Sequence, residues 1–320
     1  MYRIGIDLGG TNIAAGIVNE KFEILAKDST PTLARQRPNE AIVDDMAMLC
    51  KKLCQQLGIT EADVAAVGVV TPGVVDDERG YVTVAENMGF KNFPLVPLLR
   101  ERISIPNIYI ENDANAAAWG EAIAGAAKGS RFSVMITLGT GVGGGIVADG
   151  KLFKSFNSAA GELGHIVIEE GGRPCSCGRR GCWEAYSSAT GLINMTKDKL
   201  AACEREGRTT VMTELVAERG KVTGRTAFEG MRRGDEAAKE VVDEYIKYLG
   251  SGLASMINIF QPEILSIGGG ISNEGQTLID LVEPIVRKEQ FGSGMFETTK
   301  LRIAELRNDA GIIGAASLGM

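Results

Sequence analysis

The segment CSCGRRGCWE at residues 175–184 holds three of the six cysteines in this 320-residue chain, and the only histidine lies ten positions before the first of them. His165, Cys175, Cys177 and Cys182 thus form the pattern H-x9-C-x-C-x4-C. Three thiolates and one imidazole make a complete tetrahedral ligand set for Zn²⁺, as in structural zinc sites. A redox-active C-x-C pair is the alternative, but such a pair does not require a nearby histidine. The pattern therefore favours a structural zinc site.

Glycine-rich turns are the second feature whose residues could do chemistry. Three apolar segments end in such turns: DLGGTN (7–12), LGTGVGGG (138–145) and IGGGIS (267–272). Glycine lets backbone amides approach a ligand closely, and consecutive N–H groups can surround an anion. Thr11 and Thr140 add hydroxyl donors, and Asp7 could hold Mg²⁺ directly or through water. A single turn of this kind is more simply a tight hairpin, but three of them favour phosphate binding.

Two familiar nucleotide-binding motifs occur at the second turn, and both are rejected. The glycines from Gly139 to Gly144 satisfy G-x-G-x-x-G, but that fingerprint requires a helix to follow, whereas GIVADGKLF predicts strand, turn and strand. Residues 145–152 nearly form a Walker A loop, but Leu152 stands where serine or threonine is required. The sequence therefore gives little support to a dinucleotide-dependent oxidoreductase.

Four polar residues are candidates for acid–base or hydroxyl-binding roles. Asn112 and Asp113 lie where an apparent strand meets an alanine-rich helix. A carboxylate there can cap the helix, or it can act as a general base toward a substrate hydroxyl. Glu162 and Glu184 flank the histidine and the cysteines, so they are surface charges, supports for the metal ligands or binders of a polyol. Spacing alone leaves these alternatives open.

Hydrophobic periodicity predicts the elements that must position these residues. Residues 39–57 predict a helix, because Ile42, Met46, Leu49 and Leu53 recur at intervals of three and four. Residues 197–235 are polar and predict surface helices without a core-facing period. Further helices are predicted at 116–129, 237–260 and 310–320, and strands at 3–9, 14–20, 64–73, 107–115 and 262–272.

The opening pattern of the chain recurs near its middle. IDLGGTNIAAGIV (6–18) resembles ITLGTGVGGGIV (136–147), and each copy reads as a strand, a glycine turn and a second strand. A repeat separated by 130 residues is too long for a solenoid period and favours two duplicated lobes over a chance match. We expect the break between the lobes near residue 117.

Composition excludes several classes of protein. The chain is 44% hydrophobic and 23% charged with a formal net charge of −7, and no basic run marks a nucleic-acid binder. The N-terminus lacks the pattern of a signal peptide, and the longest uncharged stretch, 133–148, is too short to span a bilayer. We therefore expect a soluble cytoplasmic protein without nucleic-acid or membrane partners. The remaining cysteines are interpreted as ordinary thiols: Cys50, Cys54 and Cys203.

Taken in order, DLGGTN, ENDANAA, LGTGVGGG, GELGH followed by CSCGRRGCWE, and IGGGIS resemble the ROK family of sugar kinases. Within that family the chain is most similar to the bacterial glucokinases, and the resemblance covers essentially its whole length. It implies an α/β, actin-like and hexokinase-like ATPase fold of two RNase H-like lobes around a central cleft. The lobes would be residues 1–117, with a C-terminal helix at about 303–320 packed back on them, and 118–302 with the zinc knuckle.

The resemblance also implies a reaction. Asp113 would be the catalytic base for the sugar 6-hydroxyl, Mg-ATP the phosphoryl donor, and glucose 6-phosphate the product. The sugar-binding residues would be Gly73, Asn87, Asn112, Asp113, Glu162, His165 and Glu184. The nucleotide-binding residues would be Asp7, which orients Mg²⁺, with Gly9, Gly10, Thr11, Asn12, Thr140, Gly141, Gly268, Gly269 and Gly270. The structural zinc would be held by His165, Cys175, Cys177 and Cys182.

Two alternatives follow from the same resemblance. The sugar could instead be another hexose or an N-acetylhexosamine: N-acetylmannosamine, N-acetylglucosamine, mannose or fructose. EAYSSATGL, after the cysteines, favours glucose. A sugar-sensing ROK transcriptional regulator would carry a winged helix before the kinase-like part, but the first glycine motif already begins at Asp7.

Relatives commonly form dimers or tetramers, so we expect a homo-oligomer. Phe90 stands where many relatives have tryptophan, a difference expected to affect packing and not chemistry.

Overall fold

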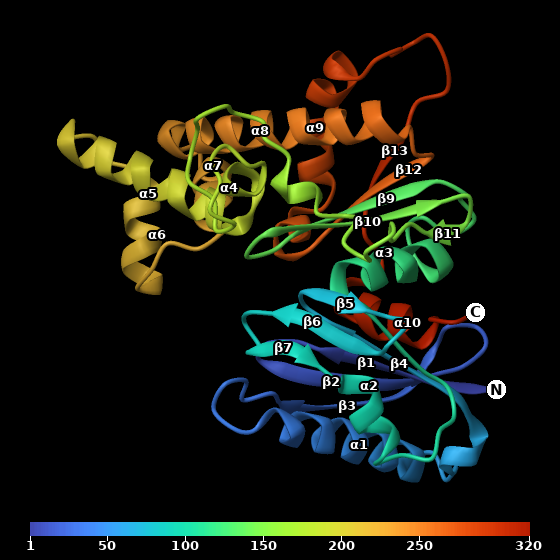
Figure 1. Cartoon of the computed structure of the whole chain (residues 1–320). Coiled ribbons are helices and arrows are strands. Elements are labelled where there is room, and N and C mark those ends of the chain that lie inside the picture. Colours follow the sequence, from blue (N-terminus) through green and yellow to red (C-terminus); the bar gives the residue numbers. More distant parts are fainter. The chain divides into compact units, whose positions relative to one another are not determined.

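The computed structural model describes residues 1–320, which divide into two compact units (Figure 1). Unit 1 comprises Met1–Arg131, Gly145–Gly161 and Glu305–Met320, and unit 2 comprises Phe132–Gly144 and Glu162–Ala304. The boundary expected near residue 117 lies within α3 (Asp113–Ala124), a helix of unit 1. None of the helices is long and apolar enough to cross a membrane.

Unit 1 is built on a five-stranded sheet in the order β3-β2-β1-β4-β8. β1 runs antiparallel to β2 and parallel to β4, and β4 runs parallel to β8. Parallel strands covered on both faces are continuously apolar, which explains why VAAVGVV lacks the alternation of a half-exposed strand. The strands are β1 (Tyr2–Leu8), β2 (Asn12–Val18), β3 (Ile24–Pro31), β4 (Val64–Thr71) and β8 (Ile108–Asn112).

Helices cover both faces of this sheet (Figure 1). α1 (Asn39–Gln56) packs on β2 and β3 and buries the four apolar residues that predicted it. α10 (Ala310–Ala316) packs on β1 and β4 together with α3, so the C-terminal helix belongs to unit 1. A Cβ on Gly5 or Gly68 would lie within 2.0 Å of a carbonyl oxygen of α10, so glycine in these strands permits the close approach of the helix.

Smaller elements complete unit 1. A three-stranded sheet has the order β5-β6-β7. Phe90 is buried there and stacks on Phe93 with ring centroids 4.5 Å apart. The elements are η1 (Glu61–Asp63), β5 (Val74–Asp76), β6 (Tyr81–Ala85), β7 (Phe90–Phe93), α2 (Leu95–Arg100) and η4 (Arg307–Asp309).

The second five-stranded sheet has the order β11-β10-β9-β12-β13. In both sheets the chain therefore visits the positions in the same sequence, with the third, second, first, fourth and fifth strands side by side. This agreement confirms the repeat and the α/β fold with two RNase H-like sheets. The strands are β9 (Ser133–Leu138), β10 (Val142–Ala148), β11 (Lys151–Leu152), β12 (Ile264–Gly268) and β13 (Lys300–Ile303), and the unit boundary falls within β10.

The helices of unit 2 gather on α8 (Glu236–Phe260), which fits the predicted range 237–260. Asp235 caps this helix by accepting hydrogen bonds from the N–H groups of Ala237 and Ala238. The expectation that residues 197–235 lack a core face was wrong, because this polar segment buries Cys203, Met212, Leu215 and Phe228. The other elements are η2 (Leu163–His165), α4 (Glu184–Ser187), α5 (Ala189–Arg205), α6 (Val211–Arg219), α7 (Thr226–Arg232), η3 (Gly270–Glu274) and α9 (Gln276–Glu289).

Candidate active site

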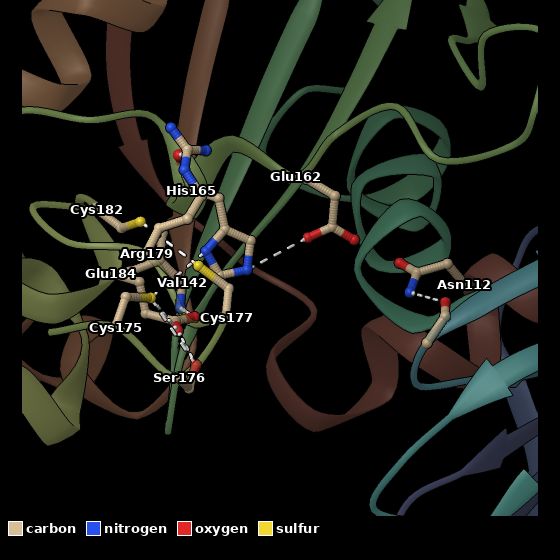
Figure 2. A network of polar contacts seen from close by, with 11 residues as sticks. Asn112, Val142, Glu162, His165, Cys175, Ser176, Cys177, Arg179, Cys182 and Glu184 are labelled. Atoms are coloured by element: carbon tan, nitrogen blue, oxygen red, sulfur yellow. Dashed lines mark hydrogen bonds and ion pairs between the residues drawn. The ribbon is translucent and has the colours of Figure 1, made fainter.

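The junction between β8 and α3 places Asn112 and Asp113 at the carboxyl edge of the unit 1 sheet. The side chain of Asn112 caps α3, since its Oδ1 accepts hydrogen bonds from the N–H groups of Ala114 and Asn115 at 2.9 and 3.1 Å. Its Nδ2 donates to the carbonyl of Gly73 at 2.9 Å (Figure 2). Gly73 has φ +91°, and a Cβ there would lie 2.1 Å from the carbonyl oxygen of Val84. Glycine is therefore required beside this junction.

Asp113 begins α3 with a carboxylate that is poorly solvated. Its Oδ1 accepts a hydrogen bond from the N–H of Ala114 at 2.8 Å. Burial raises the pKa of Asp113, and the backbone hydrogen bonds only partly oppose that rise. A general base works best when its pKa lies close to the working pH, so this environment suits proton removal from an alcohol.

Asp7 lies at the end of β1 in the same unit. Burial, followed by the negative charge of Asp113, raises the pKa of Asp7 to about 6, while Lys27 opposes the rise. Two half-buried carboxylates that repel each other are a favourable place for a hard cation such as Mg²⁺, which prefers oxygen ligands. The donor set therefore fits the magnesium ion that the sequence implies.

The turn at residues 9–12 is stabilised by hydrogen bonds from Thr32, a residue that no sequence motif identified. Gly9 N–H donates to the carbonyl of Asn12 at 2.9 Å, which closes the turn. The buried Thr32 donates its hydroxyl to the carbonyl of Gly9 at 2.6 Å and its N–H to that of Thr11 at 2.8 Å. Thr32 directly follows β3, and only the pairing of β2 with β3 brings it here.

Asn87 also lies at this turn. A Cβ built on Gly10 would be 3.6 Å from Asn87 Nδ2, whereas Gly10, Thr11 and Asn12 themselves are exposed. Unit 1 thus brings Asn87 to the first glycine turn and joins Gly73 to the junction that carries Asp113.

In unit 2 the histidine and the three cysteines converge (Figure 2). Their ligand atoms all lie within 4.8 Å of one another. Cys175 Sγ is 3.7 Å from His165 Nδ1, and Cys177 Sγ is 3.7 Å from Cys182 Sγ. Zinc–ligand bonds of about 2.3 Å to sulfur and 2.0 Å to nitrogen in a tetrahedron require separations of roughly 3.5 to 3.8 Å. Two of the separations thus match a tetrahedral zinc site, and all of them stay within 4.8 Å.

The backbone of the cysteine segment forms a tight knuckle. Isolated bridges pair Val167 with Cys182 and Pro174 with Arg180. Gly181 has φ +77°, and a Cβ there would lie 1.8 Å from the carbonyl oxygen of Glu169. Only glycine fits at this position, which explains its presence directly before the last cysteine.

The ring of His165 faces two different partners. Its Nδ1 is directed at the sulfur atoms, whereas Nε2 lies 3.9 Å from Glu162 Oε2 (Figure 2). Because η2 (Leu163–His165) is a single helical turn, Glu162 and His165 lie on the same side of it. The structure thus brings these two predicted sugar-binding residues together and leaves Nε2 outside the sulfur cluster.

Glu184 connects the knuckle to the second glycine turn. Its Oε1 accepts a hydrogen bond from Ser176 Oγ at 2.9 Å, and its Oε2 accepts one from the N–H of Val142 at 3.0 Å (Figure 2). A Cβ on Gly141 would lie 2.3 Å from the same Oε2 atom. Glu184 therefore lies against the turn at Thr140–Gly141, a contact that the sequence spacing did not predict.

The second and third glycine turns are neighbours within unit 2. Gly269 has φ +83°, and a Cβ there would lie 2.6 Å from backbone atoms of Leu138 at the end of β9. Next to the second turn, a cavity of about 480 Å³ opens toward the start of α5. Its lining includes Thr140, Gly141, Arg173, Glu184, Thr190 and Asn194. Thr190, which the sequence analysis did not identify, donates its hydroxyl to the carbonyl of Thr140 at 2.7 Å.

The structure also explains why the two nucleotide-binding motifs at the second turn do not apply. The segment after Gly139–Gly144 continues as the strand β10 and then as β11, and no helix follows it. The glycines therefore serve a strand–turn–strand unit, as in the first copy of the repeat.

Comparison with known proteins places the whole chain in one family. A family model described as the ROK family matches residues 3–320. The glucokinase of Halalkalibacterium halodurans is 36% identical over 98% of this chain and 94% of its own length. The glucokinase of Streptomyces coelicolor is 35% identical over 98% and 96%. A solved ROK family glucokinase from Streptomyces griseus, in complex with glucose and AMPPNP, has a TM-score of 0.81 and 35% identity, covering 99% of each chain.

Proposed function

Because the chain belongs to the ROK family, we propose that it is a glucokinase, which transfers the terminal phosphoryl group of ATP to the 6-hydroxyl of glucose. The observation that carries the proposal is similarity over nearly the full length to glucokinases, one of them solved with glucose and AMPPNP. The half-buried residues Asp7 and Asp113 supply carboxylates that this chemistry needs in unit 1.

Asp113 is the proposed general base. Its carboxylate accepts the proton of the 6-hydroxyl while that oxygen attacks the γ-phosphorus, and the bond from phosphorus to the bridging oxygen of ADP breaks. The hydrogen bond from Ala114 N–H fixes one carboxylate oxygen, and the Asn112 cap fixes the first turn of the helix. The base is thus held rigid before the sugar binds.

The remaining nucleotide-site residues would bind the magnesium ion and the phosphates of ATP, which neutralises the phosphate charge. Asp7 would hold Mg²⁺, which supplies positive charge to the phosphates when bound. The turns at residues 9–12, 140–141 and 268–270 would present backbone N–H groups to the nucleotide, and Thr11 and Thr140 would add hydroxyls. These assignments follow the family resemblance residue by residue.

We also propose that the knuckle holds one structural zinc ion through His165 Nδ1 and the three sulfur atoms. The spacing of these atoms supports this proposal. An imidazole has two nitrogens, so His165 Nε2 stays available to a sugar hydroxyl beside Glu162. The zinc would then be structural in its coordination and would fix the direction of a sugar-binding ring.

The test is ADP release from Mg-ATP over a panel of hexoses and N-acetylhexosamines, with wild type beside Asp113→Asn. We expect glucose to give the highest kcat/KM, and the variant to lose about 10²- to 10⁴-fold in kcat, the contribution of a positioned base. Asp243→Asn, an exposed aspartate paired with Lys239 on α8, is the matched control and should keep wild-type activity. Near-wild-type turnover by Asp113→Asn would contradict the assignment of Asp113 as the base. ADP release that no sugar stimulates would contradict the proposal that the protein is a sugar kinase.

A further inference from the structure

A partly buried ionic network adjoins the junction that carries Asp113. At its centre is Glu111, near the end of β8, whose side chain is 1% exposed. Glu111 Oε1 accepts hydrogen bonds from the backbone N–H of Asn112 at 3.0 Å and from Asn115 Nδ2 at 3.1 Å. This carboxylate is therefore bonded on both sides of Asp113, once before it in the chain and once after it.

The second oxygen of Glu111 depends on one cation. Glu111 Oε2 is buried and makes no hydrogen bond, and Lys154 Nζ lies 3.2 Å from it. The same ammonium group pairs with Asp77, whose other oxygen accepts a hydrogen bond from Ser158 Oγ at 3.1 Å. A buried carboxylate without a compensating charge is strongly unfavourable, and Lys154 supplies that compensating charge beside Glu111.

The charge on Lys154 is itself secured by its surroundings. Burial lowers the pKa of Lys154, but the hydrogen bond from Lys154 to Asp77 and the charges of Asp77 and Glu111 outweigh burial and raise it. Lys154 is therefore an ammonium ion throughout the neutral range. The network is drawn from three places in unit 1: the end of β5, the end of β8 and the segment after β11.

That last segment, residues 153–161, has an unusual backbone. Ser155 and Ser158 have φ values of +65° and +54°, a left-handed conformation that costs free energy for residues other than glycine. Lys154 and Ser158 both bond to Asp77, which holds the segment in this conformation. The chain then continues directly to Glu162, where unit 2 resumes.

We propose that Lys154 is a positioning residue for phosphoryl transfer, which acts through Glu111 to fix the Asn112–Asp113 junction. A hydrophobic pair could fill the same space without the desolvation penalty, so stability alone does not call for charges here. What a carboxylate supplies is an acceptor that ties the N–H of Asn112 to the first turn of α3. The inference rests on the proposed role of Asp113 as the base.

The test compares Lys154→Met with the double variant Glu111→Gln/Lys154→Met, with Lys154→Arg and with Lys239→Met. Methionine removes the charge and leaves Glu111 uncompensated, so we expect kcat to fall by about 100-fold, the effect of a small misplacement. The glucose KM should rise because Asn112 moves, whereas the Mg-ATP KM should stay unchanged. In the double variant no buried charge is left at position 111, and the new amide oxygen there can still accept from Asn112, so kcat should recover at least about tenfold. Arginine should restore part of the activity.

Lys239 forms an exposed ion pair with Asp243 on α8, and its replacement should leave every parameter unchanged. If calorimetry shows that Lys154→Met is unfolded at the assay temperature, the kcat and glucose KM of the double variant and of Lys154→Arg are compared with wild type instead. Wild-type kcat and glucose KM in Lys154→Met would overturn the inference while leaving the proposed function intact. A loss that the double variant does not reverse would overturn it too, since the effect would not pass through the charge of Glu111. A wild type inactive toward every sugar would instead overturn the proposed function, and the inference with it.

Discussion

His165 shows at the residue scale how one side chain can belong to two sites. Its Nδ1 faces the sulfur of Cys175 and its Nε2 faces Glu162. The two nitrogens of an imidazole point away from each other, so ligation at one leaves the other directed outward. In the proposed function, the orientation of this single histidine would therefore matter for both the zinc ion and the sugar.

Asp7 gives a prediction in which stability and function oppose each other. The pKa of Asp7 is about 6 in the folded chain and near 3.8 when unfolded, so the folded state binds more protons between these values. The free energy of unfolding must then fall as pH rises from about 4 to about 6, by about 3 kcal/mol in total. Asp7→Asn should remove this loss, so without Mg-ATP it should be more stable than wild type at about pH 7.5 and equally stable at about pH 4.

Urea unfolding at both pH values measures this effect, and a coupled ADP assay should show that the same variant has lost its activity with Mg-ATP. Asp280→Asn, at an exposed aspartate on α9, serves as the control and should change neither quantity. Equal stability of Asp7→Asn and wild type at the higher pH would show that burial does not disfavour the charged form of Asp7.

At the scale of elements, the residues proposed for catalysis lie at strand and helix ends, and buried or half-buried side chains hold those ends in place. Thr32 holds the first glycine turn, Glu111 holds the start of α3, and Glu184 joins α4 to the second turn. Each of these residues donates a hydrogen bond to backbone groups or accepts one from them, so each fixes the path of the chain. Sequence motifs identify the turn itself but not the side chain that supports it from another element.

Glu121 is a comparable support at the other end of α3. Its buried carboxylate accepts hydrogen bonds from the N–H groups of Ala126 at 2.6 Å, Glu305 at 3.1 Å and Leu306 at 2.7 Å. Glu121→Gln would place an amide N–H₂ against these donors, so we expect a loss of about 2 to 4 kcal/mol of unfolding free energy. Chemical denaturation measures this, with the exposed Glu204→Gln of α5 as control. An unchanged midpoint would show that these bonds add nothing to stability.

At the scale of the whole molecule, the two units have separate cores and one tryptophan each. Trp119 lies on α3 in unit 1, and Trp183 is buried in unit 2 directly after Cys182. This distribution lets each unit be followed by fluorescence in the same chain. The proposed zinc ion lies in unit 2 alone, so the two units should respond differently to its removal.

We predict that a zinc chelator, or Cys177→Ser, lowers the melting temperature of unit 2 by several degrees and leaves unit 1 close to its original value. The physical reason is that a structural metal contributes its binding free energy to folding of the part that holds it. The measurement is thermal melting of Trp119→Phe, which reports Trp183, beside Trp183→Phe, which reports Trp119. Cys203→Ser, at a buried thiol outside the cluster, controls for the loss of a sulfur atom. Equal shifts in both reporters, or none, would contradict a metal confined to the knuckle.

The sequence by itself determined the parts of this protein that depend on local spacing. A period of three to four residues predicted α1, and a long helix was predicted where α8 lies. The repeated strand–turn–strand pattern predicted two duplicated lobes, and H-x9-C-x-C-x4-C selected the four residues that converge. These patterns can be read from the sequence because they depend on residues that are close to one another in the chain. The same local view missed the buried face of residues 197–235, whose sparse apolar residues lie on helices that pack on one another and on α8.

Only the tertiary structure decided which distant residues support the site. Lys154 and Glu111 are 43 positions apart, Thr32 and Gly9 are 23 apart, and Glu184 and Val142 are 42 apart. No period or motif links such pairs, because their contact depends on strand order and on the return of the chain between elements. The direction of the His165 ring was likewise settled by the folded knuckle, since spacing cannot say which nitrogen faces the sulfur atoms. Residue types thus predicted the chemistry, and packing fixed the geometry in which that chemistry is held.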